Sequence, residues 1–392
     1  MNRRPGTLDV APKQWMNWHH RLDANPRLGA VHMTMDHPFG RYGSRRGFLA
    51  GLGSAAVGLS LTGLSGCGPR GKSLNFYNWD TYIGETTLAD FQKATGVKVK
   101  MSLFANNDEL FAKLRGGNQG YDVIVPTNDF VERMVVADML LPLDHAKLPN
   151  FKNIAPNFQD VDFDKGRRFS MPYTWLVLGL GYRKSKMQGV PDSWKWVFDS
   201  DRYKGKIGLL GEAGDLCRLV LKYLGYDMNS KDPAALARVE SMLTKQKANI
   251  AVFHDDNGQD LLLSRDIDVV VEYNGDIAQV MREDKDLDFV VPKEGSQISS
   301  DCLCIPKGAP NPEFAIAFIN YLLDAKAGAE ITKTIRYPTP NLAAAALMGP
   351  DYRDNQVIFP SQAILDNCQY AKYNGEAMSR TYEDILTRVR AA

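Results

Sequence analysis

Hydrophobic and polar residues follow two different periods along the chain. From residue 74 onward, short apolar runs that end at Gly or Pro alternate with segments whose apolar residues recur every three or four positions. The first pattern is typical of buried strands and the second of amphipathic helices. The first block therefore contains predicted strands at 74–79, 97–104 and 121–125 and predicted helices at 85–95, 108–115 and 128–139. Such alternation indicates right-handed crossovers and a mostly parallel sheet.

A second block of the same kind follows. Its predicted strands lie at 176–182, 205–210, 267–273 and 287–291, and its predicted helices at 215–224, 232–247, 257–264 and 276–283. A strand at 301–306 and a strongly amphipathic helix at 311–323 come next. With 392 residues, of which 44% are hydrophobic, the chain has material for about two domains. The pattern alone thus predicts an α/β protein with two lobes.

The N-terminal segment differs from the rest. Residues 44–49 (SRRGFL) precede an uncharged stretch at 50–64, which is the layout of a twin-arginine export signal. A membrane span is the alternative, but crossing a bilayer takes about 20 strongly apolar residues, and this stretch is short and rich in glycine. Residues 64–67 (LSGC) resemble a bacterial lipobox, which would leave Cys67 as a lipidated N-terminus; a chance cysteine is the other interpretation. We expect residues 1–66 to be an extension and signal, and the mature protein to be periplasmic.

Charge narrows the possible partners. The formal net charge is +1, which provides no basic field for nucleic acid. Residues 1–66 hold eight of the 47 Lys and Arg residues and three of the 46 Asp and Glu residues, so the mature chain carries a net charge of −4. An acidic surplus weakly favours a cationic partner.

Enzymatic motifs are missing from the mature sequence. The GxSxG, HExxH, SxxK and Walker patterns do not occur, and only His145 and His254 remain as imidazoles. His254 precedes Asp255 and Asp256 and could be an oriented base, but no nucleophile is identifiable to pair with it. No Cys or His spacing typical of zinc appears. We therefore expect a non-enzymatic protein without metal or cofactor; a secreted hydrolase remains an alternative.

Acidic and aromatic residues gather where the predicted strands end, which is where ligands of open α/β sheets bind. Each one alone could be a helix cap or a surface residue. Together they suit a molecule with ammonium groups joined by methylenes, because carboxylates bind ammonium and aromatic faces add cation–π attraction. The candidates at strand ends are Trp79, Asp80, Tyr82, Thr127, Glu212, Asp215, Tyr273 and Asp276. Asp301, which opens a predicted strand, and Tyr337, which precedes residues 338–340 (PTP), complete the set.

Four segments carry a family resemblance: 77–82 (YNWDTY), 121–127 (YDVIVPT), 292–295 (PKEG) and 337–341 (YPTPN). In combination they resemble the polyamine (spermidine/putrescine) binding proteins of bacterial ABC importers, from about residue 74 to the C-terminus. The resemblance implies a monomeric, two-lobed periplasmic binding protein of the type II-like α/β fold with two hinge crossovers. Such a protein captures a polyamine between its lobes and delivers it to ABC permease subunits. It touches the membrane only through a lipid anchor at Cys67.

The resemblance also implies lobe boundaries and residue roles. Lobe 1 would comprise residues 72–176 plus 302–345, and lobe 2 residues 177–301 plus 346–392. The ligand residues of the family fall on the candidates named above: the stacking Trp on Trp79, the neighbouring Tyr on Tyr82, the small polar residue on Thr127, the acidic pair on Glu212 and Asp215, and the remaining acids and aromatic on Asp276, Asp301 and Tyr337. Among the acids we expect Asp301 to matter most, then Asp215 and Asp276.

Three positions depart from the family pattern. Tyr273 stands where a Trp wall is common, Ser299 replaces a second Trp, and Thr81 occupies a position that holds an acid in other members, with Asp80 one position earlier. A cleft with fewer indoles is expected to be wider or wetter. An amine-bearing ligand is therefore better supported than a particular polyamine, and an amino acid or opine is the alternative.

Overall fold

The structure is a computed structural model that describes residues 72–392. The predicted export signal and Cys67 lie outside the described residues. Within this range the chain forms the strands β1 (Ser73–Asn78), β2 (Lys98–Leu103), β3 (Val123–Ile124), β4 (Ser170–Arg183), β5 (Ile207–Leu210), β6 (Ile250–His254), β7 (Val269–Tyr273), β8 (Leu287–Val290), β9 (Gln297–Cys304) and β10 (Gln369–Tyr370).

Helices alternate with these strands through most of the chain. The α-helices are α2 (Thr87–Thr95), α3 (Asn107–Arg115), α4 (Asn128–Val136), α5 (Pro156–Gln159), α6 (Lys195–Phe198), α7 (Ala213–Tyr223), α8 (Pro233–Gln246), α9 (Gly258–Leu263), α10 (Asn274–Val280), α11 (Pro312–Leu322), α12 (Ala325–Ile335), α13 (Leu342–Ala345), α14 (Pro350–Arg353), α15 (Gln362–Leu365) and α16 (Glu376–Ala391). The 3-10 helices are η2 (His145–Lys147), η3 (Pro149–Asn153), η4 (Lys165–Arg167), η5 (Lys184–Lys186) and η6 (Lys247–Asn249).

The strands form one mixed sheet. Its order is β2-β1-β3-β9-β4-β7-β5-β6, with β10 beside β9 and β8 beside β4. β1, β2 and β3 pair in parallel, as do β5, β6 and β7. β4 and β9 are antiparallel to each other, and they are also antiparallel to β7 and β3 respectively. The prediction of a mostly parallel sheet is therefore wrong, because two central antiparallel strands join two parallel groups.

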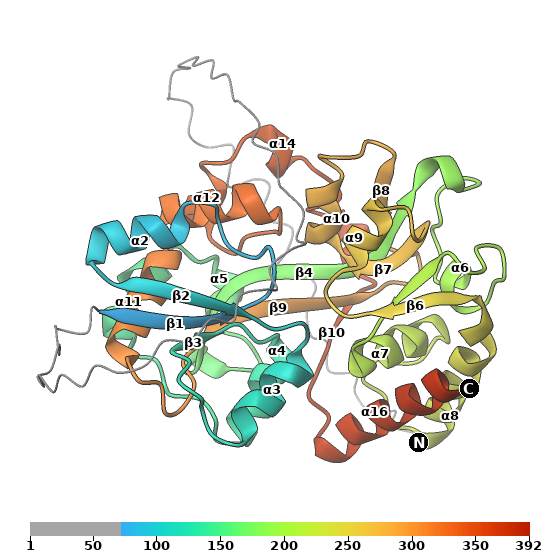
Figure 1. Ribbon diagram of the computed structural model, residues 1–392, viewed down its shortest axis with the longest axis horizontal. Helices are drawn as coiled ribbons and strands as arrows, with labels where there is room; N and C mark the ends of the chain where they lie inside the picture. Colours follow the sequence, from blue (N-terminus) through green and yellow to red (C-terminus); the bar gives the residue numbers. More distant parts are fainter. Residues whose placement is uncertain (1–71) are drawn as a thin grey trace, which may run out of the picture. The chain divides into compact units, whose positions relative to one another are not determined.

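Strand β4 connects the two halves of the sheet. Its first part, 170–177, pairs with β9, and its second part, 178–183, pairs with β7 and β8. All fourteen residues of β4 are buried. Glycine is needed in its second part, because a Cβ at Gly179 would lie 2.4 Å from the ring of Phe289. In Figure 1, β4 and β9 lie side by side between the two groups of strands.

The second joining strand begins earlier than the sequence pattern predicts. The expected strand at 301–306 is β9, which starts at Gln297 and ends at Cys304, so Asp301 lies inside the strand and does not open it. The first residues of β9 are polar and yet buried, and side-chain hydrogen bonds satisfy them. Ser300, for example, donates its hydroxyl to the Thr174 carbonyl oxygen at 3.0 Å. Hydrogen bonding of this kind lets a polar sequence form a central strand.

Each half of the sheet has its own apolar packing. Beside β1, the rings of Phe76 and Phe91 make edge contacts with Phe318 of α11, with centroids 5.2 and 4.9 Å apart. In the other half, α16 packs on α7 and α8 with Tyr382, Ile385, Leu386 and Val389, which recur at helical spacing. Figure 1 shows α11 near β1 and α16 near α7, at opposite ends of the sheet.

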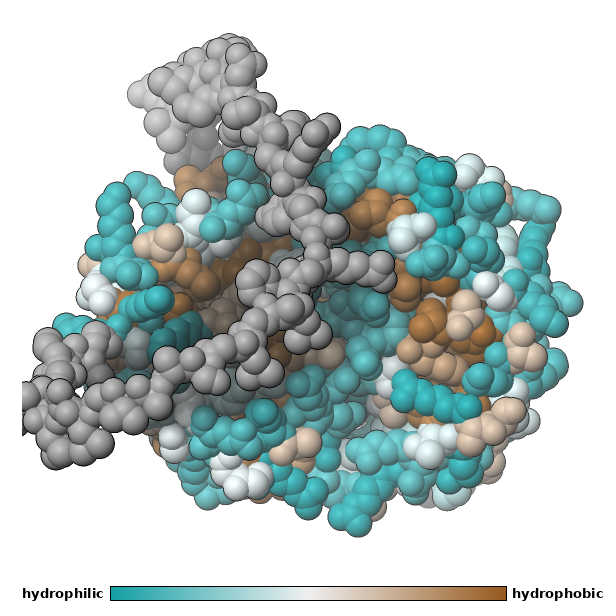
Figure 2. All heavy atoms as spheres, in the orientation of Figure 1, coloured by the Kyte–Doolittle hydropathy of each residue, from teal (hydrophilic) through white to brown (hydrophobic). Residues whose placement is uncertain are grey.

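The described residues expose few large apolar side chains. Among residues 72–392, no helix is both long and apolar enough to cross a bilayer. Hydrophilic residues predominate on the part of the face that is visible in Figure 2. The exposed large apolar side chains of the described range are Met101, Leu103, Val136, Val190 and Leu347. Such isolated exposure is ordinary for a folded domain.

Candidate functional site

Eight of the ten candidate residues line one small cavity. Leu176 and Asp256 complete its lining. The candidates that meet there are Trp79, Asp80, Tyr82, Thr127, Tyr273, Asp276, Asp301 and Tyr337. Glu212 and Asp215 are not among the residues that line this cavity. The convergence of strand ends from both halves of the sheet thus brings acids and aromatic rings together.

The backbone explains how distant segments reach the cavity. Thr127 follows β3 and forms an antiparallel bridge with Asp301 of β9, which fixes these two residues side by side. Tyr337 comes directly after α12, which ends at Arg336 in the left-handed conformation with φ of 59°. That turn redirects the chain and brings Tyr337 to the first turn of α10, where its hydroxyl donates to Asp276 Oδ2 at 2.5 Å.

Aromatic rings form the walls. The Trp79 indole nitrogen donates to the carbonyl oxygen of Val125 at 2.8 Å, and its ring lies 4.4 Å from that of Phe104. Tyr82 and Tyr337 meet edge to face with centroids 5.0 Å apart. These contacts hold the rings in place before any ligand arrives, so they form a preorganised apolar and cation–π surface.

Asp301 is a buried acid of the cavity, with the same 5% exposure as Asp276. Its Oδ2 accepts a hydrogen bond from the Tyr82 hydroxyl at 2.6 Å, and Tyr82 also contacts the hydroxyl of Thr174. Its Oδ1 is shielded from solvent and has no hydrogen-bond partner within the described chain. A buried acceptor without a donor is unfavourable by about 1 to 3 kcal/mol. Asp301 Oδ1 can therefore accept a hydrogen bond from a ligand.

Burial shifts the acids toward the neutral form. Desolvation raises the pKa of Asp301 to about 7, with repulsion from Asp276 adding to the rise and the hydrogen bond from Tyr82 opposing it. Burial likewise raises the pKa of Asp276 to about 7, against the hydrogen bond from Tyr337. Burial and repulsion from Asp276, Asp80 and Asp301 raise the pKa of Asp256 well above its usual range. A bound cation would reverse these shifts by favouring the carboxylates.

No cationic side chain compensates this group. Within residues 72–392, none of the ion pairs involves Asp80, Asp256, Asp276 or Asp301. Uncompensated carboxylates beside aromatic rings make a site for an ammonium or guanidinium group. The described residues contain no group of three or more acids, histidines or cysteines placed to hold a metal ion.

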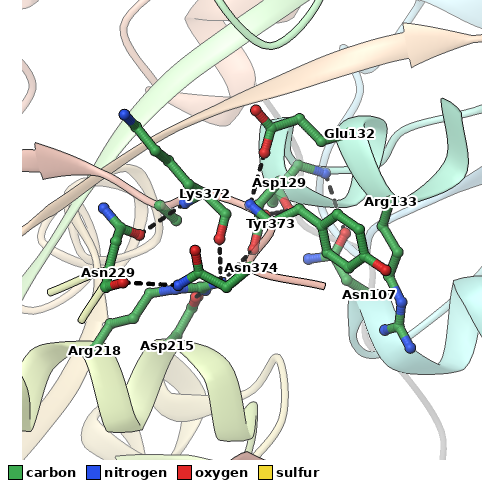
Figure 3. Close-up of polar contacts among 12 residues, drawn as sticks. Asn107, Asp129, Glu132, Arg133, Asp215, Arg218, Asn229, Lys372, Tyr373 and Asn374 are labelled. Carbon is green, nitrogen blue, oxygen red and sulfur yellow. Dashed lines mark hydrogen bonds and ion pairs between the residues drawn. The ribbon is translucent and has the colours of Figure 1, made fainter. Parts of the chain in front are cut away.

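The remaining two candidates lie beside an arginine. Asp215, in the first turn of α7, accepts from Arg218 at 3.1 Å, from the Gln297 amide at 2.8 Å and from the Tyr273 hydroxyl at 2.9 Å. Glu212 precedes α7, accepts from the Asn107 amide at 3.1 Å and lines a second cavity together with Arg218. Figure 3 shows Asp215 and Arg218 pointing toward each other.

The histidine considered as a base has a structural environment. His254 is buried at the end of β6, with its ring nitrogens 3.0 and 3.1 Å from the carbonyl oxygens of Asp255 and Val271. Burial lowers the pKa of His254, which keeps the imidazole neutral. Its Nδ1 lies 3.7 Å from the buried carboxyl of Glu272. His254 does not line the cavity that holds the candidate residues.

Two lining residues escaped the sequence analysis as ligand candidates. Leu176 lies in β4, in the predicted strand at 176–182. Asp256 follows β6, whose residues 250–253 form an apolar run that was not assigned to a strand. Had β6 been recognised, Asp256 would have stood at a strand end like the other candidates.

Gly275 permits the close approach of Tyr337, and its replacement should be disruptive. A Cβ at Gly275 would lie 2.2 Å from Cδ2 of Tyr337. We expect Gly275→Ala to lower the free energy of unfolding by about 1 to 3 kcal/mol, because the ring must move and its hydrogen bond to Asp276 must lengthen. Urea denaturation measures this change. Gly116→Ala is the control, since a Cβ there meets no atom within 4 Å; equal effects of both changes would contradict the expected packing.

The chain is similar to a family of solute-binding proteins and to individual polyamine-binding proteins. Residues 86–360 match a family described as "Bacterial extracellular solute-binding protein". A spermidine/putrescine-binding periplasmic protein of Escherichia coli is 31% identical over 349 residues, covering 88% of this chain and 97% of the relative. A putrescine/cadaverine-binding protein of Pseudomonas aeruginosa is 30% identical over 332 residues, covering 81% and 94%.

Solved structures extend the similarity to the fold. A spermidine/putrescine ABC transporter substrate-binding protein of Streptococcus pneumoniae superimposes with a TM-score of 0.70 at 29% identity, covering 82% of this chain and 99% of that one. A lipoprotein of Treponema pallidum superimposes with a TM-score of 0.72 at 27% identity, covering 82% and 100%.

Proposed function

Because the chain belongs to the bacterial extracellular solute-binding protein family, we propose that it captures a di- or polyamine and delivers it to the permease of an ABC importer. The expected α/β, two-lobed fold class and the resemblance to polyamine-binding proteins are both confirmed. Family members are solute-binding proteins rather than enzymes.

One observation carries the choice of an amine. Asp301 Oδ1 is a buried acceptor without a partner, in a cavity whose carboxylates have no cationic counterpart among the described residues. An ammonium group supplies both the missing hydrogen and the missing charge. A neutral sugar would supply only the hydrogen, and an anion would supply neither while adding repulsion. An amino acid or opine, the alternative ligands, would bring a carboxylate into this acidic cavity.

Ligand capture would couple to lobe closure. Trp79 and Thr127 belong to the half of the sheet around β1, and Tyr273 and Asp276 belong to the half around β7, while Asp301 lies in β9, which joins the two halves. A ligand held from both sides favours the closed arrangement. We place the two hinge crossings in β4 and β9, with lobe 1 as residues 72–176 plus 302–345 and lobe 2 as the remainder of the mature chain.

The route to the site of action is part of the proposal. The Escherichia coli relative is named as a periplasmic protein, and the paired arginines Arg45 and Arg46 precede an uncharged stretch in this chain. Export by the twin-arginine route, followed by lipidation of Cys67, would place a monomeric protein at the membrane beside its permease. Mass spectrometry of the mature N-terminus tests this, since an unmodified chain still carrying residues 1–66 would contradict it.

Isothermal titration calorimetry tests the proposed ligand class. The mature protein is titrated with putrescine, spermidine, spermine, agmatine, a neutral amino acid and a neutral sugar. We expect saturable heat with at least one of the amines and none with the amino acid or sugar. Heat confined to the sugar or to an anion would contradict the proposed function.

Amine affinity should rise with pH. The pKa values of Asp301 and Asp276 are about 7, so both carboxyls lose their protons between pH 6 and pH 8. Since only the carboxylate attracts ammonium, we expect putrescine affinity to fall about tenfold per group from pH 8 to pH 6. Calorimetry in buffers of different ionisation enthalpy should show proton release on binding near pH 7.

The contribution of Asp301 and Asp276 to the free energy of unfolding of the ligand-free protein should fall as pH rises. The pKa of both groups is higher in the folded than in the unfolded chain, so the folded state binds more protons between about pH 4 and pH 7. The contribution of Asp301 and Asp276 to stability is present below this range and is lost as pH rises through it. An amine affinity that is independent of pH between pH 6 and pH 8 would contradict the assignment of Asp301 and Asp276.

A further inference from the structure

Arg218 compensates an acid that would otherwise face the ligand. This side chain lies in α7, is almost fully buried, and forms ion pairs with Asp215 at 3.1 Å and with Asp129 at 3.0 Å. It also donates to the carbonyl oxygen of Lys372 at 3.1 Å. Figure 3 shows Arg218 between α7 and the segment that carries Lys372. Burial alone would lower the pKa of Arg218. The attraction of Asp129 and Asp215 outweighs that effect and raises the pKa above its usual range, so the guanidinium stays charged.

Most of the hydrogen-bonding capacity of Asp215 is already used. Its Oδ1 accepts from Arg218 and Gln297, and its Oδ2 accepts from Tyr273. An ammonium group could use only the remaining acceptor site on Oδ2, and Arg218 already compensates the charge of this carboxylate. The side of the cavity beside Tyr273 therefore offers a hydrogen-bonded and charge-compensated acid instead of a free carboxylate.

The space beyond Glu212 is also unfavourable for a cation. The cavity there is lined by Arg133 and Arg218 as well as by acids. Burial and repulsion from Asp215 and other acids raise the pKa of Glu212 well above its usual range, which favours its neutral form. An ammonium reaching this space would meet two guanidinium groups.

The four acids without a cationic partner line the same cavity as Tyr273. Asp301 and Asp276 are buried, and the half-buried Asp256 and exposed Asp80 extend from the two halves of the sheet. Repulsion from Asp80 and Asp276 contributes to the raised pKa of Asp256, which indicates that the group is compact. Such an arrangement can satisfy two ammonium groups separated by a short chain.

Resting on the proposed amine-binding function, we propose that the Arg218–Asp215 ion pair restricts this cavity to short diamines. One ammonium binds Asp301 and Asp276, and the other binds Asp80 and Asp256. The aromatic rings of Trp79 and Tyr337 cover the methylenes between them. A third ammonium, as in a triamine, would project toward Asp215 and find that carboxylate occupied by Arg218.

The wild-type protein tests the proposal without any variant. Calorimetry should give a dissociation constant for putrescine at least tenfold lower than that for spermidine. Tighter binding of spermidine would overturn the proposal and leave amine capture intact. Heat with neither amine would overturn both this proposal and the proposed function.

Removing the guanidinium should change the preference. In Arg218→Gln, Asp215 becomes available, and we expect the ratio of spermidine to putrescine affinity to rise at least tenfold. The ratio is the readout because losing the Asp129 contact can weaken closure for both ligands. Arg218→Lys keeps the charge and should keep the diamine preference. An unchanged ratio in Arg218→Gln, or a full switch in Arg218→Lys, would overturn the role of Arg218. If Arg218→Gln does not fold, the wild-type ratio and Arg218→Lys decide.

The second ammonium site has its own test. Asp256→Asn should weaken putrescine binding at least tenfold but n-butylamine binding by less than threefold, because the monoamine has no second charge for Asp256. Equal loss for both amines would show that Asp256 acts on the protein as a whole and would overturn its assignment to the second ammonium.

Discussion

Asp301→Asn should weaken amine binding by about 2 to 5 kcal/mol. The buried Asp301 Oδ1 has no partner within the described chain, and Oδ2 is held by Tyr82. A bound ammonium would complete this carboxylate, and the amide cannot supply the negative charge that a desolvated cation requires. Calorimetry with putrescine measures the loss, and circular dichroism checks that the variant is folded.

The matched control is an acid of the same type without a role in the site. Asp201→Asn changes an exposed residue that makes no side-chain hydrogen bond or ion pair among the described contacts. Asp351, an acid without a counterpart in the family pattern, is less suitable because it pairs with Arg336 at 3.2 Å, next to Tyr337. Equal putrescine affinities for the Asp301 and Asp201 variants would show that Asp301 is an ordinary strand residue.

Trp79→Ala should affect both stability and binding. The indole is buried against Phe104 and anchored to the Val125 carbonyl, so its removal should lower the free energy of unfolding by about 3 to 5 kcal/mol. Putrescine affinity should fall at least tenfold, because the wall that covers the methylenes and faces the cation is lost. Urea denaturation and calorimetry give the two quantities.

Trp79→Phe separates the wall from the anchor. It keeps an aromatic face but cannot donate to Val125, a hydrogen bond worth about 0.5 to 1.5 kcal/mol. We expect a smaller loss of stability and a putrescine affinity much closer to wild type than in Trp79→Ala. Equal losses of affinity in the two variants would contradict a role for the aromatic face.

The strand-end argument found most of the cavity because it depends on local signals. Trp79 follows an apolar run, and Thr127 follows the run that ends at Pro126, so the period of hydrophobic residues locates both. Parallel strands then bring their carboxyl ends to one edge. Asp301, inside β9, and Tyr337, after α12, do not stand at strand ends, so the family resemblance supports these two among the eight candidates that line the cavity.

The failures have physical causes. β9 was placed too late because Gln297, Ser299 and Ser300 are polar, and their burial depends on hydrogen bonds that the sequence does not show. The strand before Asp256 was not predicted although residues 250–253 are apolar, because the run is only four residues long and a short apolar run does not distinguish a strand from a helix. Arg218 stands three residues after Asp215, a spacing that allows a pair on one helix.

Tertiary structure supplies the rest of the Arg218 environment. Asp129 comes from a distant helix, α4, and no local pattern relates it to Arg218. The ion pair therefore separates Asp215 from the other candidate acids in a way that sequence resemblance does not reveal. Residues at ligand positions can change role when a neighbour changes their charge partner.

A crystal structure of the mature protein grown with putrescine tests the central claim most directly. We predict density for the diamine in the cavity lined by Trp79, Tyr337 and Asp301, with one nitrogen within hydrogen-bond distance of Asp301 Oδ1. Density for the ligand outside this cavity, or a ligand in the cavity that leaves Asp301 Oδ1 without a donor, would contradict it.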